Sequence, residues 1–418
     1  MPKKNDDFFK QKKVWSEIKD ELLGCYLTPY FNKIFYTRNS ILYLDGFAGK
    51  GKFDDGKNGS PLTALDCLNT SISQFRGNHS LPTINIIFIE LNHANDLTAN
   101  LPTEHQKRCR VISGKFEEQV IPVLQKAAES NNKQNVFIYI DPYGVKALDI
   151  ALFNALPTIF ETAELLINFN SFGLFRMACA ARKVDFREEK DGILTDLDEY
   201  DTSVVDTAEE VNVIAGGEYW QDIVDRYNKN EINGYVAEKE LSHQYKMRLR
   251  DKYNYVLDMP IRLKAGHHPK YRMIYATNHP DGCVLMAENI AKRTDDLVIG
   301  IQKGGQMSLF PETAENEFVS QDVLDANAKT LLNNYSEYIK LKNFLADFYN
   351  EFGVLCPPSA LAGKDSALSR LEKSGWIDVK RTPPTTEKTG KASSFWGWQE
   401  RDGKLVEIKR ICSQGNKL

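Results

Sequence analysis

Five short apolar segments in the first 170 residues most strongly constrain the fold of this chain. Each has the length of a strand, is apolar on both faces and is separated from the next by a stretch with helical spacing: residues 41–45, 84–90, 110–112, 136–141 and 165–169. Strands that are apolar on both faces must be covered on both sides, and a parallel sheet between layers of helices achieves this. We therefore predict an α/β, Rossmann-like sheet.

The remaining segments up to residue 296 complete this first domain. Residues 12–36 have the apolar spacing of a helix that precedes the first strand. Residues 255–264 and 271–277 read as two strands joined by a hairpin-like connection, which predicts an antiparallel pair at the end of the mostly parallel sheet. Residues 182–235 form an acidic insertion, because positions 185–210 carry 11 acidic and two basic side chains. We expect this insertion to be a solvated lobe.

A polar linker at residues 297–330 and a second domain at residues 331–418 are expected to follow. Two helical segments, 335–349 and 366–374, precede two strand-like segments at 376–381 and 394–399. Helices followed by a hairpin with basic residues are typical of a winged-helix-like domain, and a small α+β packing domain without a ligand is the alternative. Residues 364–418 hold 12 Lys/Arg and 7 Asp/Glu, so we expect nucleic acid as the partner of this domain.

The cysteines, histidines and apolar runs indicate a cytoplasmic protein without a structural metal. Seven cysteines are scattered without any C-x-x-C pair, which is typical of reduced thiols. His267 and His268 are adjacent, but no helical i, i+4 pairing relates the histidines, so we predict no metal site. No apolar run approaches the roughly 18 residues that a spanning helix needs, so no membrane partner is expected.

The end of the first predicted strand carries an acid followed by glycines. Asp45 precedes Gly46, Gly49 and Gly51, and this spacing differs from the G-x-G-x-x-G pattern of dinucleotide-binding turns. Asp45 would repel a pyrophosphate and attract a cationic amino-acid group. The pattern therefore favours S-adenosylmethionine over NAD as the cofactor, with a purely structural glycine turn as the alternative.

The ends of the second and fourth predicted strands are also acidic. Glu90 follows an apolar strand and could accept hydrogen bonds from ribose hydroxyls, or it could simply face solvent. Asp141, Pro142 and Tyr143 could form a pocket for a flat substrate, with Asp141 accepting a proton or hydrogen bond, or they could be an ordinary turn. Ligands of open parallel sheets bind at the carboxyl ends of the strands, where all three motifs are predicted to lie.

The order of LDGFAGKG, FIELN, VISGKF and IDPYG resembles that of class I S-adenosylmethionine-dependent methyltransferases. More narrowly, LDGFAGKGKFDDGKNGSPL, FIYIDPYG and MIYATNHPDG resemble the three-Cys-motif partner protein (TcmP) family, over roughly residues 12–295. The resemblance implies a methyltransferase-like fold and an association with a cysteine-motif, radical-enzyme-like protein.

By the same resemblance, each motif implies a part of the cofactor site. Asp45 and its glycines would line the methionine side, and Glu90 would hold the ribose. Ser113 and Phe116 would border the adenine. Asp141 and Tyr143 would act on the methyl acceptor, although amino-directed methyltransferases carry a second proline that this chain lacks at the fourth strand.

These observations predict a methyltransferase that acts on nucleic acid together with a cysteine-motif partner. A catalytically silent module that binds a partner protein or nucleic acid is the alternative, and the position of Asp45 argues against a nicotinamide-dependent enzyme. Within the linker, Gln306, Leu309 and Phe310 resemble the short peptide with which bacterial replication proteins bind the sliding clamp. The same apolar residues could instead pack on their own domain.

Overall fold

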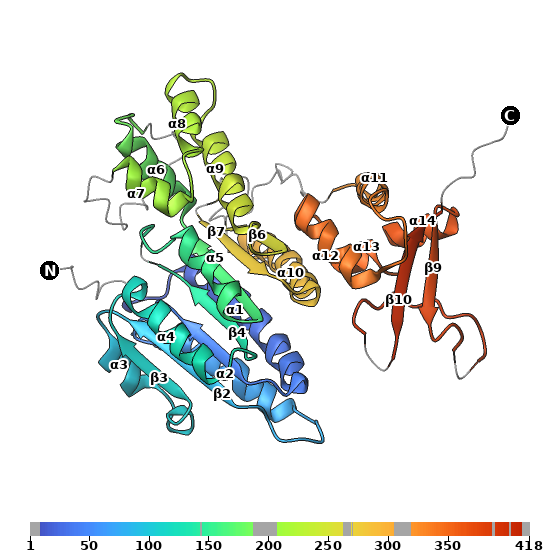
Figure 1. Cartoon of the computed structure of the whole chain (residues 1–418), viewed down its shortest axis with the longest axis horizontal. Helices are drawn as coiled ribbons and strands as arrows, with labels where there is room; N and C mark the ends of the chain where they lie inside the picture. Colours follow the sequence, from blue (N-terminus) through green and yellow to red (C-terminus); the bar gives the residue numbers. More distant parts are fainter. Residues whose placement is uncertain are drawn as a thin grey trace. The chain divides into compact units, whose positions relative to one another are not determined.

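The computed structural model describes residues 9–142, 144–186, 207–261, 269, 271–304, 319–386, 389–400 and 403–411. The chain divides into two compact units, Met1–Asn278 (unit 1) and His279–Leu418 (unit 2), and Figure 1 labels most of their helices and strands. Unit 1 contains a seven-stranded sheet, and unit 2 contains a three-stranded antiparallel sheet. No helix among these residues is both long and apolar enough to cross a membrane.

The sheet of unit 1 has the strand order β3-β2-β1-β4-β5-β7-β6. The first five strands of this order are parallel, and β7 runs antiparallel to both β5 and β6. This arrangement confirms the predicted mostly parallel sheet with an antiparallel final pair. The strands are β1 (Ile41–Asp45), β2 (Ile84–Glu90), β3 (Cys109–Ser113), β4 (Asn135–Ile140), β5 (Thr162–Phe169), β6 (Tyr255–Ile261) and β7 (Tyr271–Thr277).

Helices cover both faces of this sheet. One face packs against α1, which lies along α2, and the other packs against a core that α4 to α9 provide. The helices of unit 1 are α1 (Val14–Ile34), α2 (Ser60–Gln74), α3 (Ala94–Asn100), α4 (Phe116–Ser130), α5 (Ile150–Ile159), α6 (Ser171–Ala181), α7 (Ala208–Ala215), α8 (Trp220–Asn228) and α9 (Gly234–Leu249).

Alternation along the central strands decides which side chains lie on the α1 face. Leu42 and Leu44 of β1 belong to the core on the α4 face. Tyr43 points the other way and stacks on Phe137 of β4 at 6.0 Å between ring centroids, and Phe137 in turn stacks on Tyr26 of α1 at 5.6 Å. Because successive side chains of a strand alternate, the acids two residues beyond Tyr43 and Tyr139 also lie on the α1 face.

A buried carboxylate fixes the middle of α1 to the sheet. The Glu164 carboxylate on β5 accepts hydrogen bonds from the hydroxyls of Tyr26 (2.5 Å) and Tyr275 of β7 (2.8 Å). Burial raises the pKa of Glu164, and the two hydroxyl donors act against that rise. These bonds hold α1 against β5 and β7 at a point well past its first turn.

The predicted acidic insertion is partly wrong. Residues 187–206 lie outside the described residues, but α7 and α8 follow them and contribute Val211, Ile214 and Trp220 to the buried core. Thr207 starts α7 through a capping box with Glu210. The region is acidic overall, but its apolar side chains recur at helical spacing and therefore form one buried face.

Unit 2 combines five helices with a small sheet in the part that the structure describes. Its strand order is β8-β10-β9, and both pairings are antiparallel. The elements are α10 (Pro280–Gly304), α11 (Gln321–Leu332), β8 (Ile339–Lys340), α12 (Leu341–Phe352), α13 (Pro358–Leu361), α14 (Ala367–Lys373), β9 (Ile377–Thr382) and β10 (Leu405–Arg410).

Three expectations for this region differ from the structure. The chain divides after Asn278 instead of residue 296, because α10 packs against α12 within unit 2. The predicted linker, 297–330, contains the end of α10 and most of α11. The second strand of the hairpin lies at Leu405–Arg410 and not at 394–399. In the 394–399 segment, Trp396 packs against Arg381, whose Cζ atom lies 4.9 Å from the centroid of the Trp396 ring.

Candidate functional site

The carboxyl end of β1 lies at the centre of the candidate site, between the ends of β2 and β4. Asp45 is the last residue of β1 and is fully buried. Its Oδ2 accepts a hydrogen bond from Ser60 Oγ at 2.6 Å, and its Oδ1 accepts one from the Phe47 N–H at 3.1 Å. Gly59 occupies the N-cap position of α2, and Ser60, the first residue of the helix, uses its hydroxyl to bind Asp45.

The environment of Asp45 favours its protonated form. Burial raises the pKa of the carboxyl from 3.8 to about 7, against the lowering effect of the hydrogen bonds from Ser60 and Phe47. The nearby carboxylates Asp141 and Asp20 raise it further. A buried acid with such a pKa gains stabilisation from a cation placed beside it, because the cation offsets the cost of its ionised form.

The glycine loop, residues 46–51, follows Asp45 and is closely packed. A Cβ atom at Gly46 would lie 2.6 Å from the ring of Phe116. Gly51 has φ of +77°, and a Cβ there would lie 2.8 Å from the Leu97 side chain. Both positions therefore need glycine, one for close approach and the other for its left-handed backbone as well.

Glu90 at the end of β2 ties the glycine loop to the neighbouring turn. Its Oε2 accepts a hydrogen bond from the Gly49 N–H at 2.8 Å, and its Oε1 accepts from the N–H groups of Asn92 (2.9 Å) and His93 (3.1 Å). A carboxylate offers about four lone-pair sites, so these bonds leave about one for a ligand hydroxyl. Glu90 therefore lies where the ribose was predicted, with most of its capacity used by backbone.

Asp141, immediately after β4, is held by side chains from two other elements. Lys19 of α1 lies 2.7 Å from both carboxylate oxygens, and Asn168 Nδ2 of β5 donates to Oδ1 at 2.7 Å. The Tyr139 hydroxyl approaches Oδ2 at 3.5 Å. The second residue that we predicted to act on the acceptor, Tyr143, lies outside the described residues.

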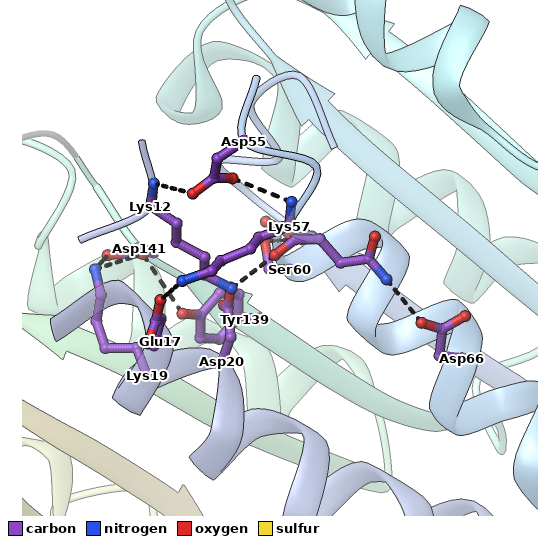
Figure 2. Close-up of polar contacts among 12 residues, drawn as sticks. Lys12, Glu17, Lys19, Asp20, Asp55, Lys57, Ser60, Asp66, Tyr139 and Asp141 are labelled. Atoms are coloured by element: carbon purple, nitrogen blue, oxygen red, sulfur yellow. Dashed lines mark hydrogen bonds and ion pairs between the residues drawn. The ribbon is translucent and has the colours of Figure 1, made fainter. Parts of the chain in front are cut away.

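Basic and acidic side chains from the start of the chain complete the cluster, as Figure 2 shows. Lys12 Nζ lies 2.5 Å from Asp20 Oδ2 and donates to the Asn58 carbonyl oxygen at 2.6 Å. Burial raises the pKa of Asp20 to about 6, although Lys12 acts to lower it. The site thus joins three acids, Asp20, Asp45 and Asp141, with the two buried ammonium groups of Lys12 and Lys19.

Sequence reasoning missed the residues that α1 contributes, although a signal was present. Ser16 and Lys19 lie three residues apart and Tyr26 follows seven residues later, so these positions share the buried stripe of the helix, which Lys12 precedes. A lysine in the phase of a buried stripe needs an acidic partner. The charged positions in this stripe therefore carry a signal beside the apolar ones.

The two residues predicted to border the adenine lie in different surroundings. Ser113 ends β3 directly beside Glu90, its register partner, and is exposed. Phe116 is buried at the start of α4, where its ring packs on Phe47 at 5.1 Å between centroids and belongs to the core of the α4 face. Phe116 therefore lies on the side of the sheet opposite to the three acids.

Several predicted positions cannot be placed in this arrangement. His267, His268 and the clamp-like residues Gln306, Leu309 and Phe310 lie outside the described residues. Among the residues that are described, no group of three or more His, Cys, Asp and Glu side chains is arranged to hold a metal ion.

The chemistry of the donor set fits a nucleoside that carries a cationic amino-acid group. Asp45 is a buried acid that a cation would stabilise, and Asp20 is a largely buried acid that already pairs with an ammonium group. Glu90 retains an acceptor at the next strand end, and the positive-φ glycines 49 and 51 lie between Asp45 and Glu90 in the chain. The comparisons with known proteins add no relative: no family model matches the sequence, and no curated protein matches it.

Proposed function

We propose that unit 1 is an S-adenosylmethionine-binding, methyltransferase-like domain of the TcmP kind, which acts on nucleic acid together with a cysteine-motif partner protein. One observation carries the proposal. Asp45 and Glu90 end β1 and β2, and Asp141 directly follows β4, so all three lie on the α1 face at the carboxyl ends of neighbouring parallel strands. Between β1 and β4 the sheet has its switch point, because β2 and β3 lie on one side of β1 and the later strands lie on the other. Open α/β sheets bind their ligands at this position.

Each of these residues would bind a different part of the cofactor. Asp45 and the backbone of the glycine loop would face its cationic methionine part, Glu90 would accept from a ribose hydroxyl, and Ser113 would lie toward the base. When bound, the cofactor supplies an electrophilic methyl group. Asp141, fixed by Lys19 and Asn168, would accept a hydrogen bond or proton from the acceptor.

Calorimetry with S-adenosylmethionine, S-adenosylhomocysteine and NADH tests the binding step. The first two ligands should bind and NADH should not. Glu90→Ala should weaken binding about ten- to hundredfold, because a hydrogen bond to a charged group is worth about 1.5–3 kcal/mol. Asp141→Ala should leave cofactor affinity nearly unchanged while abolishing methyl transfer. Absence of binding at millimolar S-adenosylmethionine would refute the proposal.

A catalytically silent module is the second candidate, and the Lys19–Asp141 pair favours it. Both oxygens of Asp141 already accept hydrogen bonds from the Lys19 ammonium, so within this structure the carboxylate is engaged by the chain itself and not by a methyl acceptor. Transfer of tritiated methyl groups into total DNA, RNA and protein fractions, with and without a co-expressed cysteine-motif protein, separates the two. Cofactor binding without transfer to any fraction would support the silent module.

For unit 2 we propose a winged-helix-like domain that binds nucleic acid. Its helices precede the β9–β10 hairpin, and Lys380 and Lys391 are exposed on or near that hairpin. Arg381 has another role, because its guanidinium pairs with both oxygens of Glu372 at 2.7 and 2.9 Å. The full-length protein should bind labelled duplex DNA or RNA with an affinity that falls as salt rises. Lys380→Ala/Lys391→Ala should weaken that binding, and an unchanged affinity would contradict the proposal.

The clamp-binding peptide remains a separate proposal for Gln306, Leu309 and Phe310. Burial of the two apolar side chains in a partner groove would contribute about 1.5–3 kcal/mol each. A pull-down with purified sliding clamp should capture the wild type and should fail with Leu309→Ala/Phe310→Ala. Equal capture of both proteins, or of neither, would end this idea.

A further inference from the structure

The first described residues of the chain cover the glycine loop. Residues 9–13, which we call the N-terminal strap, precede α1 and lie on the loop that follows β1. The Phe9 ring lies where a side chain at Gly49 would point, since a Cβ there would be 3.1 Å from the ring. Phe9 also packs edge-on against His93, with 5.0 Å between ring centroids, and Lys50 Nζ lies 4.9 Å from the centre of the Phe9 ring.

Backbone and side-chain hydrogen bonds hold the strap in this position. The Asp54 N–H donates to the Phe9 carbonyl at 2.8 Å, and the Lys12 N–H donates to Asp55 Oδ2 at 3.0 Å. Lys12 Nζ reaches Asp20 and the Asn58 carbonyl, so the only basic side chain that the strap buries is directed into the acid cluster.

We propose that the Lys12 ammonium is a surrogate for the ammonium group of the ligand, and that Asp20 is the carboxylate that binds this group once the strap has moved away. The inference rests on the proposed cofactor binding and extends it to a residue of α1. Asp20 is within electrostatic range of Asp45 and Asp141, and removal of Lys12 would leave three acids with only Lys19 to balance them. An incoming α-amino group would restore the balance.

This arrangement makes ligand binding a competition with the chain itself. The closed state satisfies the acids internally, so the apparent dissociation constant equals the intrinsic one divided by the fraction of open molecules. Weakening the strap should therefore tighten ligand binding, which is the opposite of the effect expected when a residue that only contacts ligand is removed.

Calorimetry on the full-length protein tests the surrogate role of Lys12. Lys12→Ala should bind S-adenosylmethionine about tenfold more tightly than wild type, since it loses a charge-assisted contact of the closed state. Phe9→Ala should act in the same direction. Lys52→Ala, which removes an exposed lysine immediately after the glycine loop, is the matched control and should leave the affinity unchanged.

A second comparison isolates Asp20. In the Lys12→Ala background, Asp20→Asn should weaken S-adenosylmethionine and S-adenosylhomocysteine, which carry the α-amino group, about tenfold. It should not affect 5′-methylthioadenosine, which lacks that group. An equal loss for all three ligands would overturn the role assigned to Asp20.

Hydrogen exchange in the wild type provides a readout that needs no variant. Adding S-adenosylmethionine should speed exchange at the Lys12 and Asp54 amides, because both bond across the closed strap. Equal affinities of wild type, Lys12→Ala and Lys52→Ala, or slower exchange on adding ligand, would refute the strap and leave the proposed cofactor binding intact. Failure of every ligand to bind any of these proteins would refute both.

Discussion

Unit 1 of the wild type should become less stable as the pH rises, and replacing Asp45 with asparagine should abolish this pH dependence. Burial raises the pKa of this carboxyl from 3.8 to about 7, so the folded state keeps the proton over a pH range in which the unfolded chain has released it. The stabilisation is therefore complete below about pH 4 and is lost as the pH rises through 7.

The size of the effect follows from the two pKa values. One pKa unit corresponds to about 1.36 kcal/mol, so a difference of about three units amounts to about 4 kcal/mol over the full range. Between pH 5 and pH 8 the free energy of unfolding of the wild type should fall by about 2.5 kcal/mol relative to Asp45→Asn. The asparagine keeps an oxygen for the Phe47 N–H, and the Ser60 hydroxyl can turn to accept from its amide.

Urea unfolding after equilibration at pH 5, 6, 7 and 8 measures this difference. A short deuterium pulse at one common pH, followed by mass spectrometry of peptides from β1 and β4, reports unit 1 separately from unit 2. Ser60→Ala is the companion variant, because loss of its hydroxyl should raise the pKa of Asp45 further and move the loss of stability to higher pH. Parallel curves for wild type and Asp45→Asn would refute the reasoning.

Three further perturbations test the packing of unit 1 by urea or thermal unfolding. Asp141→Ala leaves the buried Lys19 ammonium without its carboxylate and should lower the free energy of unfolding by about 3–5 kcal/mol. Adding Lys19→Met should restore most of this loss, and a double variant as unstable as the single one would contradict the reasoning. Tyr26→Phe should cost about 1–3 kcal/mol through a lost hydrogen bond to a buried carboxylate, whereas Tyr30→Phe, its neighbour one turn along α1, should cost less. Gly51→Ala should lower the melting temperature, since it costs about 1–3 kcal/mol of backbone strain at φ of +77°, and an unchanged melting temperature would speak against a closely packed loop.

The sheet and the strand-end acids could be predicted because their signals are local. β1, β2 and β7 begin and end at the predicted residues, since each is an apolar run with polar or turn residues at its ends. The period of two then places Asp45, Glu90 and Asp141 on one face, without any information about distant parts of the chain.

The partners of these acids could not be predicted, because they depend on contacts across long stretches of sequence. Lys19 and Asp141 are 122 residues apart, and the helical phase of Lys19 indicates a buried position but not its partner. Similarly, residues 394–399 alternate like a strand, whereas the pairing with β9 belongs to Leu405–Arg410. Arg381 holds the earlier segment beside the sheet, because its Nε donates to the Phe395 carbonyl oxygen at 3.0 Å and its guanidinium packs on the Trp396 ring.

The anchoring of α1 through Tyr26 limits how far the site can open. Because the bonds to Glu164 hold the helix to β5 and β7, the proposed opening involves the strap alone. The five residues of the strap span at most about 17 Å when extended. The strap and the loop it covers belong to one chain, so closure occurs at an effective concentration in the millimolar range. The open fraction is then independent of protein concentration, and a ligand must overcome the same intramolecular competitor at every dilution.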